Sequence, residues 1–136
     1  MDPMRAFLTR LLLDPRLRSA HIKAALLLYA GVLVAGSVPG ARAEVGEYAS
    51  GVVLHGLTYA FLAMLWFFGS TGSAAARAAK AVLAVALMGA GDEFIQSFFP
   101  YRGADVHDWA VDCIAATLAV LALCAVLPKT LVVAKR

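Results

Sequence analysis

The sequence predicts an all-α integral membrane protein: a bundle of four transmembrane helices, preceded by a short N-terminal amphipathic helix at the membrane interface. Composition is the first observation behind this prediction. Of the 136 residues, 62% are hydrophobic and only 15% are charged, whereas a soluble domain is about half apolar and about a quarter charged. The second observation is a series of four long apolar segments with short connections. Together they argue against a small soluble enzyme and against a disordered chain.

Each apolar segment is long enough to cross the hydrocarbon core, which takes roughly 20 helical residues. The segments cover about residues 22–38, 51–69, 78–99 and 109–127. Helices are expected because they satisfy their backbone hydrogen bonds internally, which a bilayer requires. The whole chain, residues 1–136, is therefore interpreted as one membrane domain.

Residues 1–21 are expected to form an interfacial segment. Its apolar side chains follow helical spacing with arginines among them, and Pro15 ends the pattern. A short helix lying on the membrane surface fits this arrangement. The apolar positions are Phe7, Leu8, Leu11 and Leu12.

Lysine and arginine residues predict the orientation of the bundle. With four spans, both termini and the connection between the second and third spans share one side of the membrane. That side has ten of the twelve Lys and Arg residues, and the positive-inside rule therefore makes both termini cytoplasmic. The net charge of +3 is accordingly a topology signal, and no nucleic-acid partner is expected.

Ionisable side chains from three spans are expected to lie at one depth, near the outer ends of the helices. His55 belongs to the second span, Asp92 and Glu93 to the third, and Asp112 to the fourth. At 1.5 Å per residue they are roughly 5–10 Å below the outer boundary. A charge in hydrocarbon costs roughly 2.5–3.5 kcal/mol even on lenient insertion scales, so such residues usually face a bundle interior or a wet cavity. We therefore predict a single polar cluster.

Helical spacing adds further polar side chains to the cluster, because residues four apart share a helix face. Arg102, in the following connection, is the only cation near these carboxylates, and a paired arginine would hold one of them ionised. The pairs are His55 with Tyr59, Asp92 with Gln96, and Asp108 with Asp112.

Each feature also has a purely structural interpretation. His55 can simply hydrogen-bond a neighbouring helix, and either acid of the third span can extend to the interface. The loop around His107 can be an ordinary solvated connection. Gly89 and Gly91 are expected to permit close helix packing rather than to touch a ligand.

The segment from Glu93 to Arg102 resembles the VanZ-like family of small integral membrane proteins. The family core reads approximately E-x-x-Q-x-F-x-P-x-R, then D-x-x-x-N-x-x-G after a short gap. Further matches to family patterns extend the resemblance over about residues 25–128, with three departures. Asp112 stands where the family usually has Asn, Ala115 where it usually has Gly, and Gly51-Val52 where an Asp-Lys pair often precedes the family's His. The further matches are Asp108, His55 with Tyr59, and Ser37 with Pro39.

The resemblance implies a protein of the bacterial cytoplasmic membrane. The family is named for a protein that gives low-level resistance to teicoplanin, a lipid-tailed glycopeptide. The positions that the resemblance supports are His55, Glu93, Gln96, Arg102 and Asp108, together with the divergent Asp112.

Three functions follow as hypotheses. In the first, the cluster binds the head of a membrane lipid or another lipid-tailed amphiphile in the outer leaflet, which would contribute to teicoplanin resistance or envelope homeostasis. Arg102 would then hold a phosphate or carboxylate. The ligand-binding residues would be Tyr59, Asp92, Gln96, Arg102 and Asp112.

In the second hypothesis the protein is an intramembrane enzyme. His55, Glu93 and Asp108 are the catalytic candidates, acting as acid and base on a lipid-linked substrate. A metal-assisted version would use these three residues with His107, but the chain has no diagnostic metal-ligand spacing, and neither a metal nor another cofactor is assigned.

The third hypothesis is a structural or proton-coupled role for the buried polar groups. A bundle this small is also compatible with a homo-oligomer, which the sequence leaves open.

Overall fold

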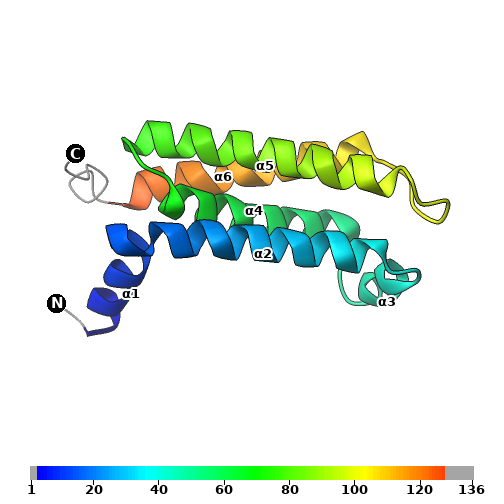
Figure 1. Ribbon diagram of the computed structural model, residues 1–136, viewed down its shortest axis with the longest axis horizontal. Coiled ribbons are helices and arrows are strands. Elements are labelled where there is room, and N and C mark those ends of the chain that lie inside the picture. The colour runs from blue at the N-terminus through cyan, green and yellow to red at the C-terminus, as the bar shows by residue number, and fades with distance from the viewer. Residues whose placement is uncertain (1–2, 128–136) are drawn as a thin grey trace.

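Long helices run side by side through the computed structural model, which describes residues 3–127 (Figure 1). The predicted all-α architecture is confirmed, because the described residues form helices and turns and no strand. Four helices, counting η1 with α2, are long and apolar enough to cross a membrane. In chain order the elements are α1 (Pro3–Leu13), the 3-10 turn η1 (Pro15–Leu17), α2 (Arg18–Ser37), α3 (Ala41–Gly46), α4 (Gly51–Gly69), α5 (Ala74–Gln96) and α6 (Val106–Val126).

Capping side chains set the first residues of three spanning helices. Ser50 accepts a hydrogen bond from the backbone N–H of Val53 at the start of α4, and Ser73 accepts one from Ala76 at the start of α5. Asp105 accepts one from the N–H of His107 at the start of α6. Each cap satisfies a backbone donor that the first helical turn leaves unpaired.

The helix bounds differ from the predicted spans in a regular way. Helix α4 coincides with the predicted 51–69, whereas α2, α5 and α6 begin three or four residues earlier than predicted. The predicted bounds began where the apolar runs were judged to begin, but these three helices start about one turn earlier, at Arg18, Ala74 and Val106. The first connection was predicted as a loop and instead contains α3, which follows Gly40 at a φ of 83°.

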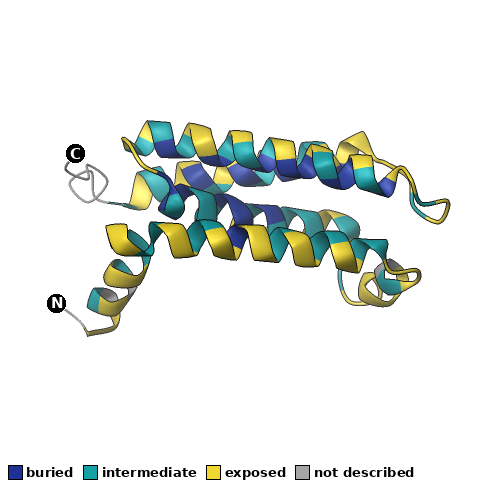
Figure 2. Ribbon diagram, in the orientation of Figure 1, coloured by how far each residue is buried: buried dark blue, intermediate teal, exposed yellow. Residues whose placement is uncertain are grey.

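Helices α4, α5 and α6 pack closely on one another, while α2 packs mainly against α4. Among the described residues of α2, Ala25 alone is buried, and Figure 2 shows most of its surface as exposed or intermediate. The outward faces of the spanning helices have large apolar side chains such as Leu27, Leu57 and Leu87. These faces suit contact with lipid tails.

Glycine residues permit the closest helix contacts. A Cβ added to Gly89 would lie 2.7 Å from Asp112 Oδ2, and one added to Gly91 would lie 2.6 Å from the Tyr29 hydroxyl. That hydroxyl donates a hydrogen bond to the carbonyl of Met88 at 2.8 Å. The predicted packing role of these two glycines is therefore confirmed.

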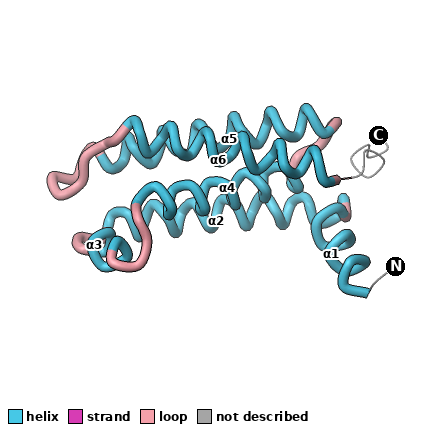
Figure 3. The backbone as a smooth tube through the Cα atoms, turned by 180° about the vertical axis from the view of Figure 1, so that it is seen from behind, coloured by secondary structure: helices cyan, strands magenta, loops and turns pink. Residues whose placement is uncertain are grey.

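The predicted N-terminal helix is present as α1, which turns away from the bundle (Figure 3). Its Phe7 and Leu11 side chains are exposed, and its location on a membrane surface stays a prediction. Helix α2 begins and α6 ends at one end of the bundle, with α3 and the α5–α6 loop at the other (Figure 1). The C-terminal cations that entered the orientation argument, Lys129, Lys135 and Arg136, lie outside the described residues.

Candidate functional site

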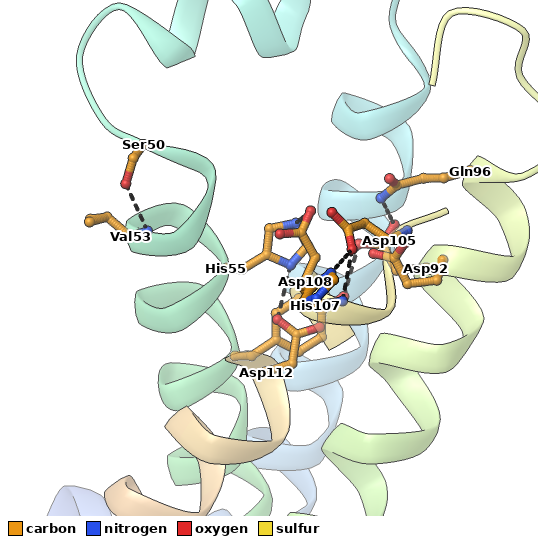
Figure 4. Close-up of polar contacts among 11 residues, drawn as sticks. Ser50, Val53, His55, Asp92, Gln96, Asp105, His107, Asp108 and Asp112 are labelled. Atoms are coloured by element: carbon orange, nitrogen blue, oxygen red, sulfur yellow. Dashed lines mark hydrogen bonds and ion pairs between the residues drawn. The ribbon is translucent and has the colours of Figure 1, made fainter. Parts of the chain in front are cut away.

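The polar side chains of α4, α5 and α6 meet near the end of the bundle that holds α3 and the α5–α6 loop (Figure 4). The carboxylates of this group are withdrawn from solvent: the exposed fractions are 2% for Asp92, 8% for Glu93, 7% for Asp108 and 0% for Asp112. Neither Asp92 nor Glu93 therefore extends to the interface. The structure brings together the ionisable residues of three spans that the sequence placed at one depth.

His55 connects α4 to α6 through two carboxylates. Its Nδ1 lies 2.9 Å from Asp112 Oδ1, which is a hydrogen bond, and its Nε2 lies 3.6 Å from Asp108 Oδ2, which is beyond hydrogen-bond distance. The imidazole also stacks on the Tyr59 ring one turn further along α4, with the ring planes 8° apart. These contacts fix the plane of the imidazole from both sides of the α4–α6 interface.

Asp92 accepts two hydrogen bonds, one on each carboxylate oxygen. The Tyr59 hydroxyl donates to Oδ2 at 3.0 Å, and Gln96 Nε2 donates to Oδ1 at 2.8 Å. The shared helix faces that spacing predicted for Asp92 with Gln96, and for His55 with Tyr59, are thus present.

Glu93 faces the α5–α6 loop instead. Its Oε2 accepts a hydrogen bond from the backbone N–H of Asp105, and its Oε1 is buried without a hydrogen-bond partner. Glu93 therefore anchors the loop that leads into α6, while it keeps one carboxylate oxygen unsatisfied. Spacing alone did not distinguish this role from that of Asp92.

His107 lies outside the cluster. Its side chain is 88% exposed, and its Nδ1 lies 2.8 Å from Asp105 Oδ1 at the N-cap of α6. The solvated-loop interpretation fits these two residues, and the metal-assisted hypothesis loses His107 as a ligand.

Arg102 reaches the cluster from the loop without pairing with a carboxylate. Within residues 3–127 it makes no ion pair, and its Nε is buried without a hydrogen-bond partner. A Cβ built on Gly36 of α2 would lie 4.0 Å from Arg102 Nη2, from Asp92 Oδ1 and from Gln96 Nε2. The guanidinium thus approaches the polar face of α5 opposite the bare backbone of Gly36.

A hydrogen bond across the end of the bundle that holds α3 and the α5–α6 loop helps to place Arg102. The hydroxyl of Tyr101 donates to the carbonyl of Ser37 at 2.7 Å, which ties the α5–α6 loop to the last turn of α2.

A cavity of about 260 Å³ lies between α2, α3, α4 and α5. Part of its wall is apolar, with Val32, Ala35, Val45 and Leu54 among the residues that line it. Five residues of the polar cluster also line it: His55, Tyr59, Asp92, Gln96 and Arg102. One cavity therefore offers both a hydrocarbon surface and a set of polar groups.

Sequence reasoning missed the α2 and α3 side of this cavity. Gly36, Val32 and Val45 have no ionisable group to draw attention. The available signal was a glycine near the C-terminal end of the first span, at the level of the polar cluster. The sequence does not give the rotation of α2 about its own axis, so this signal did not show which way Gly36 faces.

The VanZ/LLP1 family matches residues 20–127 of the chain. The searches of curated proteins and of solved structures found no match to the chain. The matched segment includes α4, α5 and α6 and nearly all of α2, so it contains both the cavity and the polar cluster. The chain therefore belongs to the VanZ/LLP1 family and is an integral membrane protein of four apolar helices.

Proposed function

We propose that the protein binds an amphiphile in the outer leaflet of the bacterial cytoplasmic membrane, with both termini of the chain in the cytoplasm. The anionic head would lie at the polar end of the cavity, and the tail along the wall formed by Val32, Val45 and Leu54. The observation that carries the proposal is the cavity itself, which combines these apolar residues with Arg102 and Gln96. Ligand sites are typically lined in this way, with a few convergent polar groups in an apolar pocket.

Arg102 is the reason for an anionic head. Its buried Nε has no hydrogen-bond partner, and its guanidinium makes no ion pair among the described residues. A buried donor without a partner costs about 1–3 kcal/mol, and more when it is charged. A phosphate or carboxylate offsets this cost, because a guanidinium can bind either group through two parallel hydrogen bonds.

Lipid-linked envelope molecules and lipid-tailed glycopeptides both combine a polar head with a hydrocarbon tail. Binding of either kind in the outer leaflet would connect the protein to envelope homeostasis or to teicoplanin resistance. Family membership makes the second connection a reasonable part of the proposal.

Titration of short-chain phosphatidylglycerol into the protein in maltoside micelles tests the proposal. Arg102→Ala is expected to weaken binding by roughly 10–100-fold, as the loss of a charged hydrogen bond implies. Arg102→Lys is expected to lose less, because the charge remains. Lys80→Ala is the matched control. Lys80 is exposed and lies in the second turn of α5, whereas Arg102 follows the other end of that helix. Equal affinity in Arg102→Ala and Lys80→Ala would contradict the proposal.

An intramembrane acid–base enzyme is the second candidate, and the His55–Asp112 pair favours it. Asp112 accepts from one ring nitrogen at 2.9 Å, and His55 lines the cavity. A carboxylate that orients an imidazole in this way is the usual arrangement of a general base. The test is incubation with extracted envelope lipids and mass spectrometry of the products. An identical product profile for the wild type and His55→Ala would exclude this candidate.

A further inference from the structure

The cluster around His55 has more negative groups than positive ones. Four carboxylates are at most 8% exposed, and the cations among the residues that line the adjoining cavity are Arg102 and, if protonated, His55. Burying several like charges together is strongly unfavourable unless opposite charge balances them, and ionised groups inside a bilayer are rare for the same reason. The cluster therefore needs additional positive charge or protons.

Three residues of the cluster hold potential metal ligands close together. One ring nitrogen of His55, one carboxylate oxygen of Asp92 and one of Glu93 all lie within 4.8 Å of one another. Asp108 Oδ2 is a fourth potential donor atom and the third oxygen, 3.6 Å from His55 Nε2. Ligand bonds of about 2.0–2.2 Å place the donor atoms of one ion about 3–4 Å apart, so a small contraction suffices for the three atoms of His55, Asp92 and Glu93.

Asp112 supports His55 in the manner of a metal site. Metal-binding histidines almost always donate their other ring N–H to a carboxylate or carbonyl group, which fixes the tautomer and the ring orientation. Asp112 Oδ1 lies 2.9 Å from His55 Nδ1, which leaves Nε2 as the nitrogen with the free lone pair. Asp112 is fully buried, so this orientation is held within the protein.

Glu93 gives an independent indication that the cluster can bind a cation. The residue is 8% exposed, and its Oε1 is buried without a hydrogen-bond partner. Asp92 also retains acceptor capacity, because each of its oxygens accepts one hydrogen bond and has a second lone pair.

We propose that His55, Asp92 and Glu93, with Asp108, bind a divalent transition-metal cation such as Zn²⁺ or Mn²⁺. The mixture of one imidazole and several carboxylates suits these ions better than Ca²⁺ or Mg²⁺, which prefer oxygen ligands alone. A spacing motif is missing because the ligands come from three different helices. The cation would lie near Arg102, so the anionic head of an amphiphile would meet two positive groups. This contact between the head and the cation rests on the proposed function, whereas metal binding itself does not.

Metal stoichiometry tests the proposal directly. Protein purified without a histidine tag in maltoside is stripped with EDTA, equilibrated with Zn²⁺ or Mn²⁺, desalted and analysed by elemental mass spectrometry. We expect about one ion per chain in the wild type, loss of the ion in Glu93→Gln, and an affinity about 10–100-fold lower in Asp112→Asn. His107→Ala is the matched control and is expected to keep the ion, because His107 is exposed beside Asp105. A metal-free wild type, or equal occupancy in Glu93→Gln and His107→Ala, would overturn the proposal.

The thermal unfolding temperature of each variant, measured with and without metal, separates loss of metal binding from loss of folding. Metal is expected to raise the unfolding temperature of the wild type, since a ligand that binds only the folded state stabilises it, and to leave that of Glu93→Gln unchanged. Without metal, Glu93→Gln is expected to unfold at the same temperature as the wild type or higher, because it removes one of the crowded carboxylates. If Glu93→Gln does not fold, Asp108→Asn takes its place, with a weaker affinity expected. A rise of equal size in the wild type and in the variant would contradict the site.

The two proposals can fail separately. Metal uptake is measured in micelles without phosphate groups, and Arg102→Ala is expected to retain it. If the wild type binds phosphatidylglycerol but takes up no metal, only the metal site is contradicted. If the protein binds metal but Arg102→Ala leaves the lipid affinity unchanged, only the role of Arg102 at the head group is contradicted.

Discussion

Tyr59 of α4 donates its hydroxyl hydrogen to Asp92 of α5, with 3.0 Å between the two oxygen atoms. Tyr59 is also one of the largest fully buried side chains in the protein. One residue therefore contributes both to the apolar core and to the polar cluster. Because Gln96 binds the other oxygen of the same carboxylate, the position of Asp92 depends on two neutral donors.

Tyr59→Phe should destabilise the folded protein by about 1–3 kcal/mol, because it removes a donor from a buried carboxylate. Unfolding in detergent, followed by circular dichroism, measures the change. Tyr48→Phe is the control, since Tyr48 is 89% exposed and removal of its hydroxyl should have little effect. Equal stability of the two variants would show that Tyr59 does not support Asp92.

Gly36→Leu should weaken phosphatidylglycerol binding without unfolding the bundle. The new side chain would start 4.0 Å from Arg102 Nη2 and Gln96 Nε2 and would extend into the cavity that Gly36 lines. Gly31→Leu is the control on the same helix, because a Cβ there meets nothing within 4 Å. Lipid titration in maltoside measures both, and an affinity unchanged in Gly36→Leu would place the ligand elsewhere.

Gly89→Ala should destabilise the α5–α6 interface by roughly 1–3 kcal/mol, the usual cost of overpacking. The added Cβ would lie 2.7 Å from Asp112 Oδ2 and 3.1 Å from Trp109 Cδ1. Trp109 has little room to withdraw, because its indole N–H donates to the carbonyl of Ala86 at 2.9 Å. Chemical unfolding compares this variant with Gly56→Ala, whose Cβ would meet its nearest neighbour at 3.9 Å. The close-packing role of Gly89 fails if both lose the same amount.

Cysteine labelling checks the orientation predicted from the positive charges. In a variant without Cys113 and Cys124, Glu47→Cys beside α3 should react with a membrane-impermeant maleimide in intact cells. Thr71→Cys, between α4 and α5, should react only after the membrane is opened. Both positions are exposed, so burial does not bias the comparison. The reverse pattern would place both termini outside the cytoplasm.

The sequence predicted the helical class and the meeting of the polar groups at one level of the bundle, because both follow from one-dimensional patterns. Apolar length identifies a span, and residues four apart share a face, which placed Asp92 with Gln96. The α3 helix was missed because it is six residues long and lies in a polar connection without an apolar run.

The partners across the helices could not be predicted in the same way. That His55 bonds Asp112 while Tyr59 bonds Asp92 depends on how α4 is rotated between α5 and α6. Pattern arguments treat Asp92 and Glu93 as interchangeable neighbours. A rotation of about 100° between successive residues instead directs Glu93 toward the backbone of Asp105.

The two acids near the end of α5 have a consequence for how the protein is made. When α5 first enters the bilayer, Asp92 and Glu93 lack the partners that other segments give them in the folded protein, although Gln96 of α5 itself is available to Asp92. The other partners come from α4, synthesised earlier, and from the loop before α6, synthesised later. An acid in a helix raises the cost of membrane insertion, and for α5 this cost falls only when its neighbours on both sides arrive. Biogenesis of the bundle should therefore depend on α4, α5 and α6 leaving the insertion machinery together.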